Sequence, residues 1–283
     1  MIEINRKLKI YFLIFLAYLN VLAWLAVFDL AQSNLKVIFF DVGQGDSIFI
    51  ETPQKHQILI DGGPDSSVLG KLGQNMPFYD RTLDLIILTH PEHDHIAGLF
   101  DVLKNYQVEN ILWTGVLKDT AEFKEWSELI QKENAQIKIA QAGQRIYVNQ
   151  NSPKRADLFV LHPFENLDGK DIENTNDTSV IVKLIFGENS FLFCGDASKS
   201  VEHKLIDKNI DISTEILKIA HHGSKNSTSE KFLKKVAPDL AVISVGLDNS
   251  YGHPNPEVLA LLEKYGIKLL RTDINGDISF LSK

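Results

Sequence analysis

Five of the six residues from His90 to His95 carry side chains that can bind a metal ion or a proton. The segment reads His-Pro-Glu-His-Asp-His and follows directly on the apolar, strand-like run Leu83–Leu88. Buried carboxylates and imidazoles at this density cost free energy unless a cation lies among them. The segment therefore predicts a metal site at the end of a strand.

Two later junctions offer ligands of the same kinds. Asp196 follows the apolar run Ser190–Cys194, and His221 and His222 follow the run Glu215–Ala220. Imidazole and carboxylate together suit zinc, manganese or iron. About six ligands are too many for one tetrahedral ion, but suit two ions that share a carboxylate. Each junction alone could be an ordinary turn; the three together favour a dinuclear site.

The elements that must position these residues alternate between strands and helices. Two similar halves predict an α/β (α+β) fold in which two sheets pack together and helices cover both outer faces. The sequence after residue 34 contains no linker, so we expect one domain. A final hairpin is predicted to turn at Asn275-Gly276. The predicted strands are Leu35–Asp41, Ser47–Glu51, Gln57–Asp61, Leu83–Leu88, Val108–Trp113, Ile137–Ala140, Arg145–Val148, Asp157–Leu161, Ser179–Phe186, Ser190–Cys194, Glu215–Ala220 and Leu240–Val245. The predicted helices are Ser67–Asn75, Ile96–Asn105, Lys118–Asn134, Ser198–Lys208, one opened by Ser227–Glu230, and one from Pro256 to near Gly266.

The N-terminal segment contains an uncharged run from Ile10 to Phe28. As a helix it would span roughly 28 Å, close to the thickness of the bilayer hydrocarbon. Basic residues precede the run and Asp29 follows it, so the positive-inside rule places the N-terminus in the cytoplasm and the remainder outside. A cleaved signal peptide is the alternative, but the run is long for one and Asp29 disfavours the small-residue cleavage pattern. We therefore expect an uncleaved anchor.

Composition excludes several classes of protein. The formal net charge is −8 and the pI is near 5.6, so no broad basic face for nucleic acid is expected. A phosphate-bearing substrate would need its charge met locally, which metal ions could do. Cys194 is the only cysteine, which excludes an intrachain disulfide and a thiolate zinc cluster. We expect Cys194 to be a buried apolar residue.

Several motifs, taken together, resemble a known family. The segment His90–His95 is similar to the His-x-His-x-Asp-His signature of the metallo-β-lactamase fold, with Glu92 in place of the second histidine. Asp61, Asp196 and His222 match the first, fourth and fifth motifs of that superfamily. The segments Asp41–Ser47, Leu217–Ser224 and Tyr251–Pro254 further resemble the metallohydrolase domain of ComEC-type competence proteins. The resemblance spans essentially all of residues 35–283.

The resemblance implies a four-layered αββα sandwich. With the anchor expected from the apolar run, we assign residues 1–33 to one transmembrane helix and residues 34–283 to the hydrolase domain. It implies two divalent ions, zinc or manganese. Carried over by motif, His90 serves one ion, Asp94 and His95 the other, Asp196 bridges both, and His222 completes the second. Glu92 would shift the first site toward oxygen-preferring ions such as manganese. The stretch Asn176–Ser179 replaces the third-motif histidine, so this first site would be weak or would fill only with substrate; His93 is not expected to be a ligand.

The implied activity is a phosphodiesterase or nuclease that acts with metal-activated hydroxide on extracytoplasmic DNA or a related phosphodiester. The expected catalytic residues are Asp94, Asp196, His221 and His253, with His221 or His253 protonating the leaving oxygen. The expected substrate-binding residues are Asp46, Asp61, Asn176, Ser179, Ser224 and His253. A turn-forming role for Asp61 and an ordinary strand-entry turn at Asn176 and Ser179 remain open, as does a phosphate contact from Asn249 or Lys225. A loop-positioning role is the simpler interpretation of His162.

Expected partners are a phosphodiester or nucleic-acid substrate, the cytoplasmic membrane through a single-pass N-terminal helix, and a separate DNA-uptake channel; no disulfide partner is implied. Two alternatives remain. One is a hydrolase of another ester, a lactone, a thioester or a choline-phosphate group on the same metals; a true β-lactamase is disfavoured because the second and third motifs lack their histidines. The other is a non-catalytic, competence-associated binding module with a vestigial site.

Overall fold

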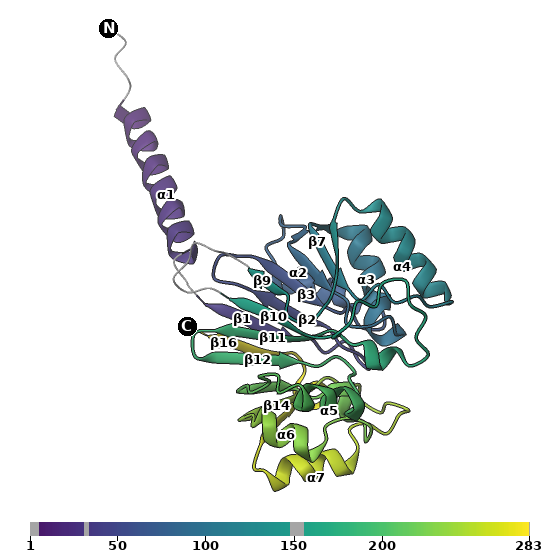
Figure 1. The fold of residues 1–283 in the computed structure, drawn as a ribbon. Coiled ribbons are helices and arrows are strands. Elements are labelled where there is room, and N and C mark those ends of the chain that lie inside the picture. The colour runs from purple at the N-terminus through teal and green to yellow at the C-terminus, as the bar shows by residue number, and fades with distance from the viewer. Residues whose placement is uncertain (1–5, 31–33, 148–155, 283) are drawn as a thin grey trace.

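The computed structural model describes residues 6–30, 34–147 and 156–282. Helix α1 (Arg6–Leu30) stands apart from the rest of the molecule (Figure 1). Its window Lys7–Trp24 is long and apolar enough to cross a membrane, and none of that window is buried against the remainder of the chain. This agrees with the helix predicted from the sequence, and its length and composition are compatible with an anchor. The predicted strand end at Val148 and the anchor boundary at 31–33 lie outside the described residues.

Two large sheets and one small ladder follow α1. In the order in which the strands pair, the first sheet contains β16 (Ile278–Ser282), β1 (Leu35–Phe39), β2 (Ile48–Glu51), β3 (Gln57–Ile60), β5 (Leu85–Ile87), β7 (Asn110–Trp113) and β8 (Gln136–Ile139). The second contains β15 (Lys268–Arg271), β14 (Leu240–Ile243), β13 (Ile216–Lys218), β12 (Asn189–Phe193), β11 (Ile181–Phe186), β10 (Asp157–His162) and β9 (Arg145–Tyr147). The ladder pairs β4 (Thr82–Leu83) with β6 (Gln107–Val108).

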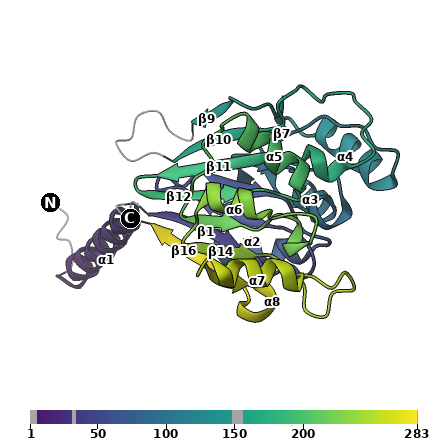
Figure 2. The ribbon, with the colours of Figure 1, turned by 60° about the horizontal axis from the view of Figure 1, so that its bottom comes forward.

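The two sheets pack face to face, and helices cover both outer faces (Figures 1 and 2). Alternate strand residues such as Phe39, Ile50, Phe186 and Phe193 form the core between the sheets, as the period-2 geometry of strands requires. Two outer cores lie beneath the helices. Helices α2 (Ser67–Asn75), α3 (His93–Asn105) and α4 (Ala121–Lys132) pack on the first sheet, and α5 (Lys199–Asp207), α6 (Glu230–Val236) and α7 (Pro256–Lys264) on the second. The predicted αββα sandwich is confirmed.

The boundary of α3 differs from the prediction in a way that matters for the site. The predicted helix begins at Ile96, but the structure begins it at His93. Asp94 and His95 therefore lie in its first turn, where backbone geometry fixes their directions. The predicted strand Leu83–Leu88 is split between β4 and β5, because β4 turns away to pair with β6.

The predicted C-terminal hairpin at Asn275-Gly276 is wrong. β15 pairs in parallel with β14 in the second sheet, whereas β16 pairs antiparallel with β1 in the first. The short helix α8 (Thr272–Asn275) carries the chain from one sheet to the other. Local turn chemistry suggested a hairpin, but pairing with β1 closes the edge of the first sheet and buries Ile278 in the core.

Candidate metal centre

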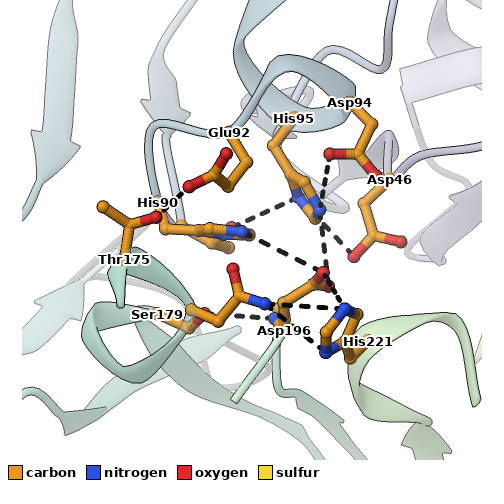
Figure 3. Close-up of polar contacts among 12 residues, drawn as sticks. Asp46, His90, Glu92, Asp94, His95, Thr175, Ser179, Asp196 and His221 are labelled. Atoms are coloured by element: carbon orange, nitrogen blue, oxygen red, sulfur yellow. Dashed lines mark hydrogen bonds and ion pairs between the residues drawn. The ribbon is translucent and has the colours of Figure 1, made fainter. Parts of the chain in front are cut away.

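Parallel strands in both sheets end at one edge of the sandwich, and the candidate ligands follow those ends. In the first sheet, β3 leads to Asp61 and β5 to His90. In the second, β12 leads to Asp196 and β13 to His221 and His222. Figure 3 shows side chains from both sheets converging on Asp196. Ligand sites at the carboxyl ends of strands are the expected arrangement for open parallel sheets.

The imidazoles of His95 and His222 each lie between the carboxylates of Asp94 and Asp196. The Nε2 atom of His95 lies 3.4 Å from Asp196 Oδ1 and 3.9 Å from Asp94 Oδ1. The Nε2 atom of His222 lies 3.2 Å from Asp94 Oδ2 and 3.6 Å from Asp196 Oδ2. A tetrahedral ion with bonds of about 2.0–2.1 Å requires donors separated by about 3.3 Å. We refer to Asp94, His95, Asp196 and His222 as the four-donor site.

The imidazole of His95 is oriented by a chain of hydrogen bonds behind it. Its Nδ1 donates to Asp61 Oδ2 at 2.8 Å. The same carboxylate accepts from the Thr89 backbone at 2.8 Å and from the Thr89 hydroxyl at 2.7 Å. The Thr89 oxygen in turn lies 3.0 Å from Nδ1 of His90. With both Nδ1 atoms engaged as donors, both Nε2 atoms are left as acceptors that face the site.

His222 is held in the same manner. Its Nδ1 donates to the backbone oxygen of Ser244 at 2.8 Å, so Nε2 is free to bind an ion. Both His221 and His222 have φ near +51°, a left-handed conformation that costs free energy for a non-glycine residue. The turn that this conformation makes is what aims two successive imidazoles into the site.

Orphaned polar atoms support metal binding. The Nε2 atoms of His90 and His95 and the Oδ1 atom of Asp196 are buried and make no hydrogen bond within the described ranges. Leaving such atoms unsatisfied costs about 1–3 kcal/mol each, and a cation between them removes that cost. The donor set of the four-donor site thus fits a divalent ion.

Close backbone packing holds the first turn of α3 against the loop after β3. A Cβ at Gly98 would lie 2.0 Å from the oxygen of Gly62, so only glycine fits there. The Gly98 amide donates to Gly63 O at 3.0 Å, and the Gly62 amide donates to His95 O at 2.8 Å. This contact sets the position of His95 relative to the loop that carries Asp61.

The predicted ion beside His90, the first site of the sequence motifs, has fewer donors. His90 Nε2 lies 4.0 Å from Asp196 Oδ2. Glu92 lines the neighbouring cavity, but its Oε1 pairs with Lys118 Nζ at 2.5 Å and accepts from the Thr175 hydroxyl. The structure therefore does not bring the Glu92 carboxylate together with the imidazoles. Among the described residues, His90 forms a triplet of candidate ligands with His95 and Asp196, whereas Glu92 belongs to no such triplet.

We expect the chain to bind one ion tightly at the four-donor site and a second one weakly beside His90. Replacing Glu92 with Gln should change the affinity of the tight ion by less than about threefold. Substituting a residue that hydrogen-bonds to a metal ligand typically lowers metal affinity by about 10–100-fold. Asp94→Asn changes a ligand itself, so it should lower the affinity for the tight ion by more than that. Titration of metal-free protein with Mn²⁺ or Zn²⁺, read by calorimetry, distinguishes the two variants. Loss of the tight ion in Glu92→Gln would instead make Glu92 a ligand of the four-donor site, whereas the sequence motif places it on the ion beside His90.

Lys218 is a buried site residue that the sequence analysis did not single out. Its Nζ forms an ion pair with Asp46 Oδ2, donates to Gly195 O at 3.1 Å and lies 3.9 Å from Asp196 Oδ1. Burial alone lowers the pKa of Lys218, but the carboxylates of Asp46 and Asp196 raise it above the usual value. A charged residue inside the apolar run before His221 was the available signal, because a buried lysine requires a partner.

Electrostatics couple the carboxylates to the imidazoles. Burial by itself raises the pKa of Asp196, but His222 and His95 hold it well below its ordinary range. Burial lowers the pKa of His95, but Asp196 and Asp61 raise it well above its usual value. Burial also lowers the pKa of His222, but Asp196 and Asp94 raise it above its usual value. These carboxylates thus favour the protonated forms of His95 and His222 while no ion is bound.

Metal binding should therefore release protons. His95 and His222 must be neutral to ligate, while their raised pKa values favour the protonated forms in metal-free protein. The apparent metal affinity should rise with pH, by about tenfold per pH unit for each proton released. Calorimetry in buffers of different ionisation enthalpy measures the number of protons directly. An observed binding enthalpy that is the same in all buffers would contradict this charge distribution.

An open cavity of about 350 Å³ leads to the four-donor site. His221 lies beside Asp196, with Nε2 3.8 Å from Oδ2, and the Asn176 amide lies 3.4 Å from its Nδ1. The His253 ring lies 5.7 Å from that of His221 and is stacked at 6.0 Å on Tyr251. Burial lowers the pKa of both His221 and His253, which favours their neutral forms. The cavity is lined by Gln44, Glu92, Asp94, Asn174, Asn176, Asp196, His221, His222, Tyr251 and His253.

Several residues predicted to bind substrate lie behind the site instead. Asp46, Asp61 and Ser179 are buried and do not line the cavity. Asp61 orients His95, Asp46 pairs with Lys218, and the Ser179 hydroxyl accepts from the Asp196 amide at 3.1 Å. Ser224 is also buried; its amide bonds to His221 O in the turn. These positions are out of reach of a substrate in the cavity, so we assign them the positioning of ligands.

Other candidates have structural roles. Asn249 bonds through its side chain to the backbone of Gly246, Tyr251 and His253, and so fixes the loop that carries His253. His162 is buried and its Nδ1 bonds to Ser179 O at 2.8 Å, in agreement with a positioning role. His93 faces Glu122 at 3.5 Å, away from the four-donor site. Cys194 is buried, and burial raises the pKa of its thiol.

Comparison with known proteins agrees with this geometry. The sequence profile of the metallo-beta-lactamase superfamily matches residues 40–246. Igni18, a metallo hydrolase of the archaeon Ignicoccus hospitalis, has a similar fold, with a TM-score of 0.56 at 15% identity over 88% of this chain and 100% of that one. CmlA, a diiron β-hydroxylase of Streptomyces venezuelae, aligns with a TM-score of 0.55 at 13% identity over 87% of this chain and 54% of its own. At these identities the structural matches show the fold alone.

Curated sequences include competence proteins. ComE operon protein 3 of Bacillus subtilis is 30% identical over 93% of this chain and 35% of its own length. Competence protein ComA of Neisseria gonorrhoeae is 28% identical over 88% of this chain and 32% of its own length. The chain thus spans about a third of the length of these relatives. The expected resemblance to ComEC-type competence proteins is confirmed.

Proposed function

Because the chain belongs to the metallo-β-lactamase superfamily, we propose that it is a metal-dependent phosphodiesterase or nuclease. The four-donor site is the observation that carries the hydrolytic part of this proposal. Its imidazole nitrogens lie 3.2–3.9 Å from carboxylate oxygens, near the donor separation around a tetrahedral ion, beside an open cavity. The similarity to competence proteins supports DNA or a related phosphodiester as the substrate.

Asp94, His95, Asp196 and His222 would hold a zinc or manganese ion, and Asp196 and His90 would hold a second. A divalent ion there supplies Lewis-acid chemistry: it lowers the pKa of water and offsets the negative charge that develops on phosphorus oxygens. His221 and His253 face the same cavity and are placed to move a proton at the leaving oxygen. Their lowered pKa values would rise when an anionic phosphodiester binds beside them. The Asn176 amide is a donor for a phosphate oxygen.

Location forms part of the proposal. We place residues 1–33 in the cytoplasmic membrane as a single-pass anchor and residues 34–283 outside it as the hydrolase domain. The exposed, apolar window of α1 and the basic residues before it support this orientation. A separate DNA-uptake channel is the partner that such a location would favour.

The proposal is tested with purified full-length chain in detergent, loaded with Mn²⁺ or Zn²⁺. We expect turnover of bis-p-nitrophenyl phosphate and of single-stranded DNA, and none after chelation. Nitrocefin, a lactone and a choline phosphodiester serve as competing substrates. Faster turnover of a competing substrate would favour the other-ester hydrolase, and bound metal without any turnover would favour the binding module.

A further inference from the structure

Phe78 and Tyr79 are the most exposed large hydrophobic side chains in the part of the chain that the structure describes. Phe78 is 87% exposed and Tyr79 is 76% exposed. They lie between α2 and β4, and their rings pack edge to face with centroids 5.4 Å apart. Single exposed hydrophobic residues are common, but two adjacent aromatic rings presented together need an explanation.

The loop that carries them is held firmly at its base. The Asp80 amide donates to Pro77 O at 2.9 Å, which closes a turn around the two aromatic residues. The Asp80 carboxylate accepts from Gln57 Nε2 at 3.0 Å and from the Thr82 amide at 3.1 Å. The chain therefore holds the aromatic rings outward instead of folding them against α2.

This loop lies at the end of the sandwich to which α1 is joined. Gln57, which holds Asp80, is the first residue of β3, and Lys36 at the start of β1 donates to Asn75 at the end of α2 at 2.9 Å. Leu30 ends α1 and Leu35 begins β1, so the two are separated by at most about 18 Å of chain. Figure 1 shows α1 leaving from this end, beside the start of β1 and the C-terminus.

The metal centre lies at the opposite end of the same strands. The far end of β1 leads to Asp46, and the far end of β3 leads to Asp61. At about 3.4 Å per residue, β1 alone separates the two ends by about 17 Å. An anchor at one end of the sheets thus holds the cavity away from the membrane that α1 would cross.

We propose that Phe78 and Tyr79 insert into the interfacial region of the bilayer that α1 crosses, and that the domain docks with its metal centre facing away from the lipid. The inference rests on the proposed membrane anchor. Aromatic rings favour the interface between headgroups and hydrocarbon, where an apolar ring and a polar hydroxyl are both satisfied. The exposed Arg81 beside them suits anionic headgroups. In this orientation the site meets water-soluble substrates and not lipids of its own membrane.

Depth-dependent quenching by brominated lipids tests this orientation on the full chain in nanodiscs of phosphatidylcholine and phosphatidylglycerol. Trp113 and Trp126 are buried, so Trp24→Phe leaves no exposed native tryptophan in the described ranges. In that background, Tyr79→Trp should be strongly quenched by lipids brominated near the headgroup. Leu247→Trp is the matched control: Leu247 is 74% exposed but lies at the metal end, where Gly246 bonds to Gln44, and it should not be quenched.

Trp24 in the parent chain separates failure of the anchor from failure of the docking. Quenching of Trp24 without quenching at position 79 would overturn the docking and leave the anchor intact. Equal quenching at positions 79 and 247 would overturn the orientation. An unquenched Trp24 would reject the anchor itself, and with it the surface proposed here.

Discussion

Replacing Asp196 with Ala should remove bound metal and lower hydrolytic activity by more than about 100-fold. Substituting a residue that only hydrogen-bonds to a metal ligand typically costs about 10–100-fold, and the loss of a ligand shared by both ions should cost more. The Asp196 carboxylate faces four imidazoles: His95 at 3.4 Å, His222 at 3.6 Å, His221 at 3.8 Å and His90 at 4.0 Å. In the described part of the chain, no other carboxylate forms an ion pair both with His90 and with the imidazoles of the four-donor site, His95 and His222. Its removal leaves each site without its shared ligand.

Mass spectrometry of metal content and turnover of bis-p-nitrophenyl phosphate measure the two effects separately. Asp177→Asn is the control, since the Asp177 carboxylate bonds to Ser198 and not to the imidazoles; it should keep both metal and turnover. Circular dichroism verifies that each variant is folded. A variant at position 196 that retains one tight ion per chain and a tenth of the activity would contradict the bridging role. A parent chain that binds less than one ion, unaltered by the substitution, would favour a non-catalytic module.

Replacing Lys218 with Met should lower the free energy of unfolding by about 3–5 kcal/mol. This is the cost of removing one partner from a buried ion pair, because Asp46 would lose the ammonium that pairs with it, and the nearest other cationic group, His222 Nδ1, lies 3.5 Å away. Lys218 and Asp46 are both buried, and the ammonium also lies 3.9 Å from Asp196. Bound metal partly offsets the lost charge, so the loss should be larger in metal-free protein. Denaturant unfolding with and without Mn²⁺ gives both values.

Two further variants show whether the loss at position 218 is electrostatic. Combining Lys218→Met with Asp46→Asn removes both charges and should recover part of the stability. Lys183→Met is the matched control on strand β11 of the same sheet. Lys183 is buried and its ammonium lies 2.9 Å from the carboxylate of Asp211, which is exposed to solvent. Because water can solvate Asp211 after the substitution, the control should cost about 1 kcal/mol or less. Equal losses at positions 183 and 218 would indicate lost packing rather than an uncompensated charge.

The two-sheet sandwich and most of its elements could be predicted from the sequence. Strands such as Ile48–Glu51 and Gln57–Ile60 are short apolar runs bounded by turns, and local patterns of this kind identify them. Local patterns could not show that the strands on either side of Asn275-Gly276 belong to different sheets. Asn275-Gly276 is a good turn in isolation, but the partner of β16 is β1, more than 200 residues earlier in the chain. A long-range pairing of this kind leaves no local signal.

The candidate ligands were identifiable by type and spacing, because histidine and aspartate after apolar runs are costly without a cation. Residue types alone determined that Asp94, His95, Asp196 and His222 could bind metal. Only the tertiary structure decided that these four side chains lie together, that Glu92 turns to Lys118 and Thr175, and that Lys218 neutralises Asp46 beneath the site. The physical reason is that a ligand set depends on where Nε2 and carboxylate oxygens point. Those directions are set by the first turn of α3, the left-handed turn at His221 and the hydrogen bonds behind each ring, which come from strands far apart in the chain.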